Sequence, residues 1–139
     1  MSAPTVVITH SEEFSSAHQL KSPVLDDAQN RELYGPCYNV HGHNYRLEVS
    51  VRGPVHPDTG MVMNLTQLMA IMRDEVIAHV DHVDLNKDVD FLADMIPTAE
   101  TLAVVFWDRI EPHLVAGCSL VRVRVVESRD NRVDYYGPA

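Results

Sequence analysis

The 139-residue sequence has few of the features that mark membrane, secreted and nucleic-acid-binding proteins. It holds no run of 18 apolar residues, which argues against a membrane span. Two cysteines are too few for a disulfide framework, and the first ten residues lack a basic start followed by an apolar core, so we expect a cytoplasmic protein. The 20 acidic against 11 basic residues argue against a general nucleic-acid binder, because such a protein needs a basic face.

Internal repeats, low-complexity segments and Gly/Ser-rich linkers are also lacking. Because domains usually contain roughly 100–150 residues, the chain 1–139 is predicted to form a single domain. Histidine is the exception to this ordinary composition. The chain has eight histidines, where average usage would supply about three. Their placement is therefore the first evidence to consider for chemistry.

Four segments have the composition or the alternation of β-strands. Residues 45–52 alternate apolar and polar, which predicts a half-buried strand with an apolar inner face. The inner face would consist of Tyr45, Leu47, Val49 and Val51. Residues 6–20 form a β-rich run, residues 120–127 alternate again, and residues 133–136 follow a turn. Residues 21–36, rich in Pro, Asp, Asn and Gly, are predicted to form a loop.

Two segments have helical spacing and a helix-capping residue. Asn64 is a good N-cap for an amphipathic helix over residues 65–80, and Thr98 caps a second helix that ends near Pro112. The order β-β-α-α-β-β predicts an α+β fold: a four-stranded antiparallel sheet with both helices on one face. Such a sheet has two open edges, which favours oligomerisation through them.

Three histidines are placed so that their side chains can converge. His41 and His43 flank Gly42 at the start of the second predicted strand, where residues i and i+2 point to the same face. His18 lies in the preceding strand, the expected antiparallel neighbour. A lone His-x-His is usually a core or surface feature. Three neutral imidazoles with an open fourth position, however, are typical of a catalytic zinc site.

Cys37, four residues before His41, has three interpretations. It is a fourth zinc ligand that closes the site, an activated thiolate that acts as base or nucleophile, or inert packing. The preceding Pro36 and the loop context favour an exposed thiol over a buried one.

The pair Asp81-His82 and the residue Glu127 each have a functional and a structural interpretation. On a loop, Asp81 could orient the imidazole of His82, which could then serve a thiol; a histidine that interacts with a helix C-terminus is an equally good explanation. At a strand end, Glu127 could accept paired N–H donors from a planar heterocycle. Periodicity alone favours a solvated strand end for this residue.

The ordered set of motifs resembles the family of 6-pyruvoyl-tetrahydropterin synthase and 6-carboxytetrahydropterin synthase. Each motif alone is weak, but the set covers nearly the whole chain in order. The matching segments are Phe14-Ser15-Ser16-Ala17-His18, Leu33-Tyr34-Gly35-Pro36-Cys37, His41-Gly42-His43-Asn44-Tyr45, residues 59–65, Asp81-His82, Leu85-Asn86, Pro97-Thr98-Ala99-Glu100 and Val126-Glu127.

This resemblance implies a tunnelling fold (T-fold), in which β-β-α-α-β-β subunits assemble into barrels. It implies a homohexamer of two trimers with active sites between subunits, in agreement with the open sheet edges. The implied activity is that of a zinc-dependent lyase that converts 7,8-dihydroneopterin triphosphate to 6-pyruvoyl-tetrahydropterin with loss of triphosphate, as in tetrahydrobiopterin biosynthesis. The expected partners are this small molecule and further copies of the chain, with no nucleic acid or membrane.

Position in the motifs also implies a role for individual residues. The zinc ligands are His18, His41 and His43. The catalytic residues are Cys37, Asp81 and His82. The substrate-binding residues are Glu127, which anchors the pterin ring, and Thr98 and Glu100 in the loop beside it.

The spacing around Cys37 leaves the product open. Only three residues separate Cys37 from His41, which resembles 6-carboxytetrahydropterin synthase, an enzyme of queuosine biosynthesis that releases acetaldehyde and triphosphate. The loop before Cys37 and the segment Met63-Asn64-Leu65 resemble the pyruvoyl type, and more of the chain favours that type. A non-catalytic zinc-binding assembly protein is a further alternative, although a bare zinc module would need none of the proposed catalytic residues.

Overall fold

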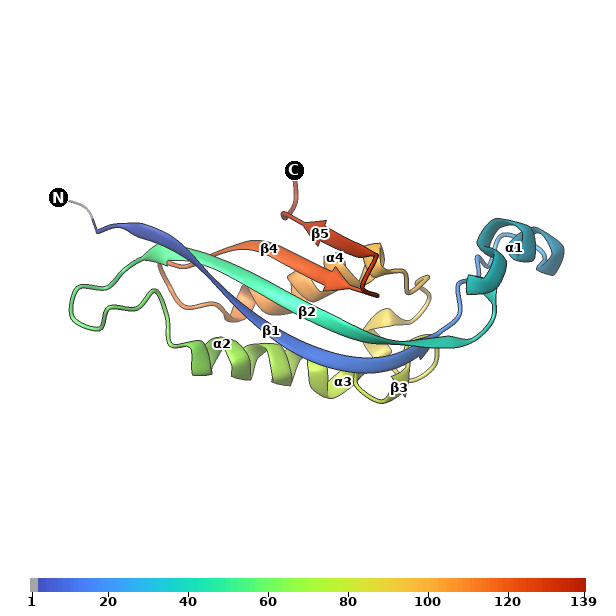
Figure 1. Ribbon diagram of the computed structural model, residues 1–139, viewed down its shortest axis with the longest axis horizontal. Helices are drawn as coiled ribbons and strands as arrows, with labels where there is room; N and C mark the ends of the chain where they lie inside the picture. Colours follow the sequence, from blue (N-terminus) through green and yellow to red (C-terminus); the bar gives the residue numbers. More distant parts are fainter. Residues whose placement is uncertain (1–2) are drawn as a thin grey trace.

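The computed structural model describes residues 3–139, which form a five-stranded sheet with helices packed against one face (Figure 1). The sheet order is β3-β1-β2-β4-β5. The strands are Thr5–His18 (β1), His41–Pro54 (β2), Val83–Asp84 (β3), Ser119–Val126 (β4) and Arg132–Tyr135 (β5). The helices are Asp27–Tyr34 (α1), Leu65–Met72 (α2), Ala78–Val80 (α3) and Ala99–Ile110 (α4). This architecture confirms the predicted α+β class.

Strands β1 and β2 form a long antiparallel pair that positions the histidines. Their register runs from Thr5 opposite Pro54 to His18 opposite His41. The predicted inner face of β2 is confirmed, because four side chains on it have no exposed surface: Tyr45, Leu47, Val49 and Val51. Since side chains alternate along a strand, His41 and His43 lie on the same face of β2 as this buried row.

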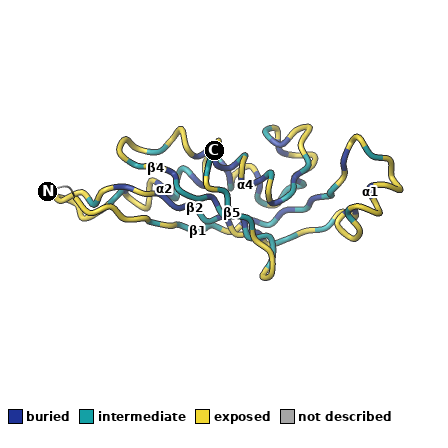
Figure 2. Tube along the Cα trace, turned by 90° about the horizontal axis from the view of Figure 1, so that it is seen from above, coloured by how far each residue is buried: buried dark blue, intermediate teal, exposed yellow. Residues whose placement is uncertain are grey.

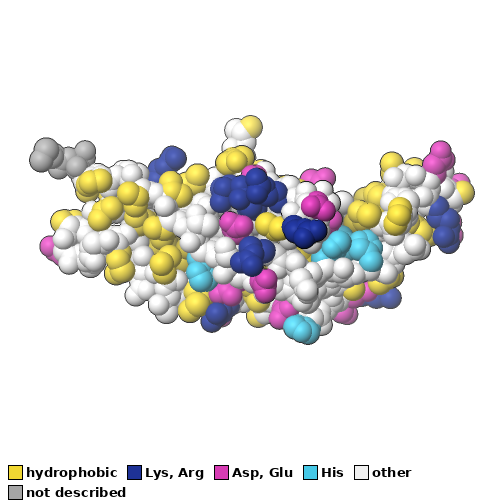
Figure 3. All heavy atoms as spheres, viewed as in Figure 1, with side chains coloured by type: hydrophobic (Ala, Val, Ile, Leu, Met, Phe, Trp, Pro, Cys, Tyr) yellow, Lys and Arg dark blue, Asp and Glu magenta, His cyan; other side chains and the backbone are white. Residues whose placement is uncertain are grey.

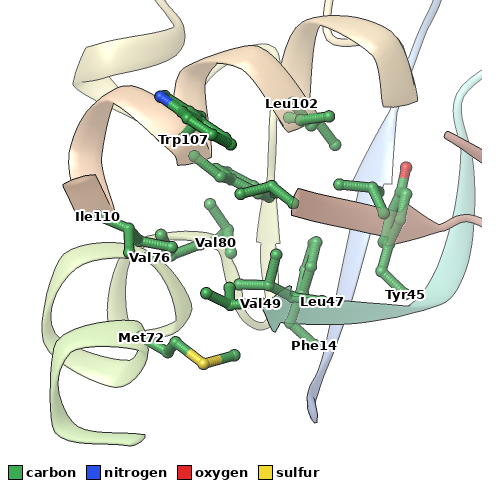
Figure 4. Packing of buried hydrophobic residues seen from close by; sticks show 14 of the residues in the cluster. Phe14, Tyr45, Leu47, Val49, Met72, Val76, Val80, Leu102, Trp107 and Ile110 are labelled. Carbon is green, nitrogen blue, oxygen red and sulfur yellow. The ribbon is translucent and has the colours of Figure 1, made fainter. Parts of the chain in front are cut away.

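The core lies between this sheet face and helices α2 and α4 (Figure 4). Phe14 of β1 stacks on Tyr45 at a ring-centroid distance of 4.7 Å, and Phe106 of α4 meets Phe14 edge-on at 6.0 Å. Figure 2 shows the buried positions running along the middle of the sheet and the inner sides of the helices, with exposed positions at the loops and on α1. His18, the last residue of β1, lies at one end of this core and has no exposed surface.

Both predicted helix starts are confirmed by capping hydrogen bonds. Asn64 Oδ1 accepts the backbone N–H of Thr66 at 2.9 Å, and Thr98 Oγ1 accepts that of Thr101 at 3.1 Å. The helix predicted over residues 65–80 consists of α2, a π-helical turn at Arg73–Ile77 and α3. No helix among residues 3–139 has the length and hydrophobicity needed to cross a membrane.

The prediction of a loop over residues 21–36 is wrong in part, because the segment contains α1. A capping box starts this helix: Asp26 and Gln29 each accept the other's backbone N–H, at 2.8 and 3.0 Å. The helix carries no apolar stripe, and Asn30 is its buried residue. Local capping without hydrophobic periodicity explains why composition favoured a loop. In Figure 1, α1 projects from one end of the sheet.

The prediction of four strands is also wrong, since β3 adds a fifth. Val83 and Asp84 pair in parallel with Ser16 and Ala17 of β1. A two-residue strand is too short to give an alternating pattern, so periodicity could not find it. Its effect is local: it ties the segment after α3 to the end of β1 that carries His18.

Candidate metal centre and active site

The structure brings the three predicted zinc ligands together at one end of the β1–β2 pair. The nitrogen atoms that His18, His41 and His43 can offer to a metal ion all lie within 4.8 Å of one another. The three rings meet edge to face, with centroids 4.5 to 5.3 Å apart. In Figure 3, histidine side chains reach the surface between the sheet and the projection that carries α1.

Backbone carbonyls fix the tautomers of two of these rings. His18 Nδ1–H donates to the carbonyl of Pro97 at 2.8 Å, and His41 Nδ1–H donates to that of Asn39 at 2.7 Å. Because a carbonyl only accepts, both neutral rings carry their lone pair on Nε2. These two Nε2 atoms lie 3.0 Å apart, an unfavourable approach of two acceptors that a cation between them would make favourable. Orientation of metal-binding histidines by carbonyls is a common second layer around a metal.

His43 completes the group with an unsatisfied nitrogen. Its Nε2 is buried and has no hydrogen-bond partner among the described residues. Burial lowers the pKa of His43, the neighbouring His41 lowers it further, and the carboxylate of Glu127 opposes the shift. The pKa of His18 is also lowered, mainly by burial. Metal ions need neutral imidazoles, so the three-nitrogen donor set and the lowered pKa values of His18 and His43 fit a metal ion such as Zn²⁺.

Asp81 and His82 form the pair that the loop interpretation requires. Asp81 Oδ1 lies 2.9 Å from His82 Nδ1, and it also accepts the backbone N–H of Ser15 at 2.8 Å. This backbone hydrogen bond lowers the pKa of Asp81, and the bond to His82 lowers it further, so the carboxylate is ionised near neutral pH. His82 has a φ of 60°, a left-handed conformation that is uncommon for a residue other than glycine. The imidazole is 81% exposed, open to a partner.

His82 and His43 line the same open hollow, of about 470 Å³, together with Ser15, Ser16, Ala17, Gly42, Asn44, Val83, Asp84 and Asp88. One ring of the three-histidine group and the ring of the Asp–His pair therefore face the same space within a single chain.

Cys37 lies on the short 3₁₀ turn Gly35–Tyr38 and is exposed, as the sequence indicated. The backbone of this turn is tied to the end of β1, since the N–H of Leu20 donates to the carbonyl of Cys37 at 3.0 Å. Among residues 3–139, the group of converging metal-binding atoms contains the three histidines and not the thiol. The structure also gives no hydrogen bond between Cys37 and His82 within the described chain.

Glu127 and Glu100 line a second hollow, of about 460 Å³, with Ala99, Asp130, Asn131, Arg132 and Val133. Glu127 Oε1 lies 3.9 Å from His43 Nε2, so this hollow adjoins the histidine group. Thr98 directly precedes Ala99 in the sequence, and its hydroxyl oxygen caps the start of α4.

Three residues that orient the site were not identified from the sequence. The carbonyls of Asn39 and Pro97 fix the ligand tautomers, and the amide of Ser15 holds Asp81. Asn39 lies two residues before His41, close enough to be suspected from a turn. Pro97 is 79 positions from His18, so only the tertiary structure reveals their contact.

Comparison with known proteins gives one consistent result. A family model described as 6-pyruvoyl tetrahydropterin synthase matches residues 7–138. The 6-pyruvoyl tetrahydrobiopterin synthase of Drosophila melanogaster is 42% identical over 137 residues, which cover 97% of this chain and 82% of the relative. That of Dictyostelium discoideum is 42% identical over 133 residues, covering 96% and 97%. A putative 6-carboxy-5,6,7,8-tetrahydropterin synthase of Archaeoglobus fulgidus is less similar, at 32% over 125 residues and 90% of each chain.

The fold is shared as well. The structure of Caenorhabditis elegans 6-pyruvoyl tetrahydropterin synthase superposes with a TM-score of 0.91 at 35% identity, covering 99% of each chain. This agreement confirms the T-fold topology of the subunit. On sequence and on structure, the chain belongs to the 6-pyruvoyl tetrahydropterin synthase family.

Proposed function

We propose that this protein is a zinc-dependent lyase that converts 7,8-dihydroneopterin triphosphate to 6-pyruvoyl-tetrahydropterin and releases triphosphate. The observation that carries the proposal is the three-histidine group, with two lone pairs facing each other 3.0 Å apart, beside an ordered Asp–His pair. Membership of the family supplies the substrate class. We further propose that the enzyme works in the cytoplasm.

In this proposal His18, His41 and His43 hold the metal ion. Zinc bound there would supply Lewis acidity toward the hydroxyl oxygens of the substrate side chain, which would acidify the neighbouring C–H and O–H bonds. The contribution of the chain is an open, preoriented set of three imidazole donors, because the converging group among residues 3–139 contains no thiol.

Asp81 and His82 would act as a proton relay. The carboxylate of Asp81 fixes a proton on His82 Nδ1, which leaves His82 Nε2 free to accept a proton and pass it on. The exposed position of the ring allows it to reach a group outside its own chain.

Cys37 would act as the base that removes a carbon-bound proton of the substrate. This role requires a partner that makes its thiolate accessible near neutral pH. Because no hydrogen bond joins Cys37 and His82 within residues 3–139, a second copy would bring them together. We therefore propose that active sites form between subunits of a homohexamer, built through the open edges of the sheet as two trimers.

Glu127 would anchor the pterin ring through two of its N–H groups, with Glu100 and the backbone near Thr98 along the same hollow. The short distance from Glu127 to His43 would place the ring beside the metal ion, so that the substrate side chain reaches it. Removal of the carbon-bound proton would then allow an internal redox shift into the ring and loss of triphosphate, with no external reductant.

One incubation distinguishes this proposal from its alternatives. Purified protein with zinc and 7,8-dihydroneopterin triphosphate should release triphosphate and a 6-pyruvoyl product without acetaldehyde. Stoichiometric acetaldehyde would instead identify 6-carboxytetrahydropterin synthase, which the three-residue spacing between Cys37 and His41 favours. No release of triphosphate would leave a non-catalytic zinc-binding assembly protein.

A further inference from the structure

The helical segment that leads to Asp81 has an unusual pattern of buried residues. Leu68, Met72, Val76 and Val80 follow one another at intervals of four, and none has exposed surface. In a regular α-helix, residues four apart drift by about 40° per step, which amounts to about 120° from Leu68 to Val80. A regular helix would therefore place Val80 at the far edge of the core-facing stripe, about 120° from Leu68.

The π-helical turn Arg73–Ile77 corrects this drift. Within it the N–H of Ala78 donates to the carbonyl of Arg73, five residues back instead of four. The wider turn keeps Val80 on the core side, and Asp81 follows at once. The turn thus decides in which direction the chain leaves the helix.

One side chain from another helix holds this turn. Arg109 of α4 donates from Nε to the backbone carbonyl of Glu75 at 2.6 Å, and from an Nη nitrogen to the Glu75 carboxylate at 3.2 Å. Its guanidinium also lies 4.0 Å from the centroid of the Phe91 ring. A side chain that bonds a helical carbonyl in this way stabilises a departure from regular helix geometry.

A continuous set of hydrogen bonds connects this turn to the Asp81–His82 pair and to β1. Asp81 N–H donates to Ile77 O at 3.0 Å, and the Val80 carbonyl accepts the hydroxyl of Ser16. Ser15 then holds both residues of the pair: its N–H donates to Asp81 Oδ1 at 2.8 Å, and its carbonyl accepts the N–H of His82 at 2.6 Å. Rotation of the helix end would break these bonds to β1.

We propose that Arg109 is a positioning residue of this enzyme: by donating to the Glu75 carbonyl it holds the π turn and so aims the Asp81–His82 pair. The inference rests on the proposed function of that pair. Without the Nε donor, the turn relaxes toward regular α-helix, and the residues after it rotate by about 100°, one helical position. Arg109 itself lines neither the hollow of His82 nor that of Glu127.

Two nearly isosteric substitutions test the donor. Arg109→Gln places an amide nitrogen where Nε stands, whereas Arg109→Met places a methyl group there. Both substitutions remove the charge and the guanidinium stacked on Phe91. A difference between the two variants in kcat or in the NMR spectrum therefore reports the hydrogen bond to the Glu75 carbonyl. Glu75→Gln is the matched control, because it removes the carboxylate partner of Arg109 but keeps the carbonyl.

We expect kcat of zinc-loaded Arg109→Met to fall about ten- to hundredfold, as for a misplaced catalytic group. KM should change little, because Glu127 and Glu100 lie at another hollow, and zinc content should stay full. The amide proton of Ser15, which donates to a carboxylate, should move upfield in the NMR spectrum of Arg109→Met. Arg109→Gln and Glu75→Gln should stay close to wild type in both measurements.

Three results would overturn the inference: a wild-type Ser15 amide signal in Arg109→Met, equal losses in the Gln and Met variants, or a loss of kcat matched by a loss of zinc. If Arg109→Met is insoluble, Arg109→Leu, which also places no donor beside the Glu75 carbonyl, takes its place in the same comparison with Arg109→Gln and Glu75→Gln. The NMR measurement needs no substrate. It therefore separates this inference from the proposed lyase activity, whose failure would appear in the wild-type protein.

Discussion

The facing lone pairs of His18 and His41 predict how metal and stability are linked. Both Nε2 atoms are acceptors 3.0 Å apart, and the nearby Nε2 of His43 has no hydrogen-bond partner among residues 3–139, so a zinc ion between the three nitrogens would replace an unfavourable approach of lone pairs by metal–ligand bonds. A ligand that binds only the folded state stabilises it by about 2.7 kcal/mol at a hundred times its Kd, and by about 4.1 kcal/mol at a thousand times. For a domain of this size that corresponds to a rise in Tm of about 10 °C.

The experiment compares His41→Ala with wild type, and uses His56→Ala as the control. His56 is exposed and lies outside the metal-binding group. Thermal unfolding is followed after chelation and again with zinc in excess, at one protein concentration. Zinc should raise the Tm of the wild type and of His56→Ala by about 10 °C, and should hardly change that of His41→Ala. Elemental analysis should show that His41→Ala has lost its metal.

The metal-free proteins give the sharper test. Removing His41 takes away one of the two opposed lone pairs, so chelated His41→Ala should unfold at a temperature no lower than that of chelated wild type. If His41→Ala is clearly less stable than wild type without metal, the ring contributes packing and no repulsion exists. If zinc stabilises His41→Ala as much as wild type, the metal binds elsewhere, and the proposed site is refuted.

Three further substitutions test the proposed chemistry. Cys37→Ala should keep its zinc and lose about 10²- to 10⁴-fold in kcat, as expected for a general base; unchanged turnover would remove the thiol from the mechanism. Asp81→Asn should lose a similar factor, about 10²- to 10⁴-fold, because an amide can stabilise the wrong tautomer of His82; a wild-type kcat would show that Asp81 only anchors Ser15. Glu127→Gln should raise KM about ten- to hundredfold through loss of charged hydrogen bonds to the ring, with zinc retained; an unchanged KM would place the pterin elsewhere.

Much of the site could be predicted from the sequence because its geometry is local or set by strand pairing. His41 and His43 share a face as any residues i and i+2 of a strand do, and pairing of two consecutive strands brings His18 opposite His41. The two N-caps were equally predictable, because Asn64 and Thr98 act on residues two or three positions away. Helix α1 and strand β3 could not be found, since neither has enough apolar residues to produce a period.

Contacts between distant segments account for what the sequence could not reveal. The carbonyl of Pro97 fixes the tautomer of His18, but a backbone group has no residue type that could mark it. The same holds for Ser15, whose amide and carbonyl, and not its hydroxyl, hold the Asp81–His82 pair. Backbone groups carry this part of the site, so its geometry is encoded in the fold as a whole.

The π-helical turn differs from the local features that could be predicted and from the distant contacts that could not, because the spacing of apolar residues in the sequence encodes it. Four apolar residues at strict intervals of four, from Leu68 to Val80, cannot all face the core of a regular α-helix without a drift of about 120°. A spacing of this kind therefore favours a wider turn somewhere between them, which side chains that bond its carbonyls can stabilise. Arg109 donates a hydrogen bond to the carbonyl of Glu75, which lies inside this interval. This bond connects the spacing of apolar residues to the direction in which Asp81 and His82 point.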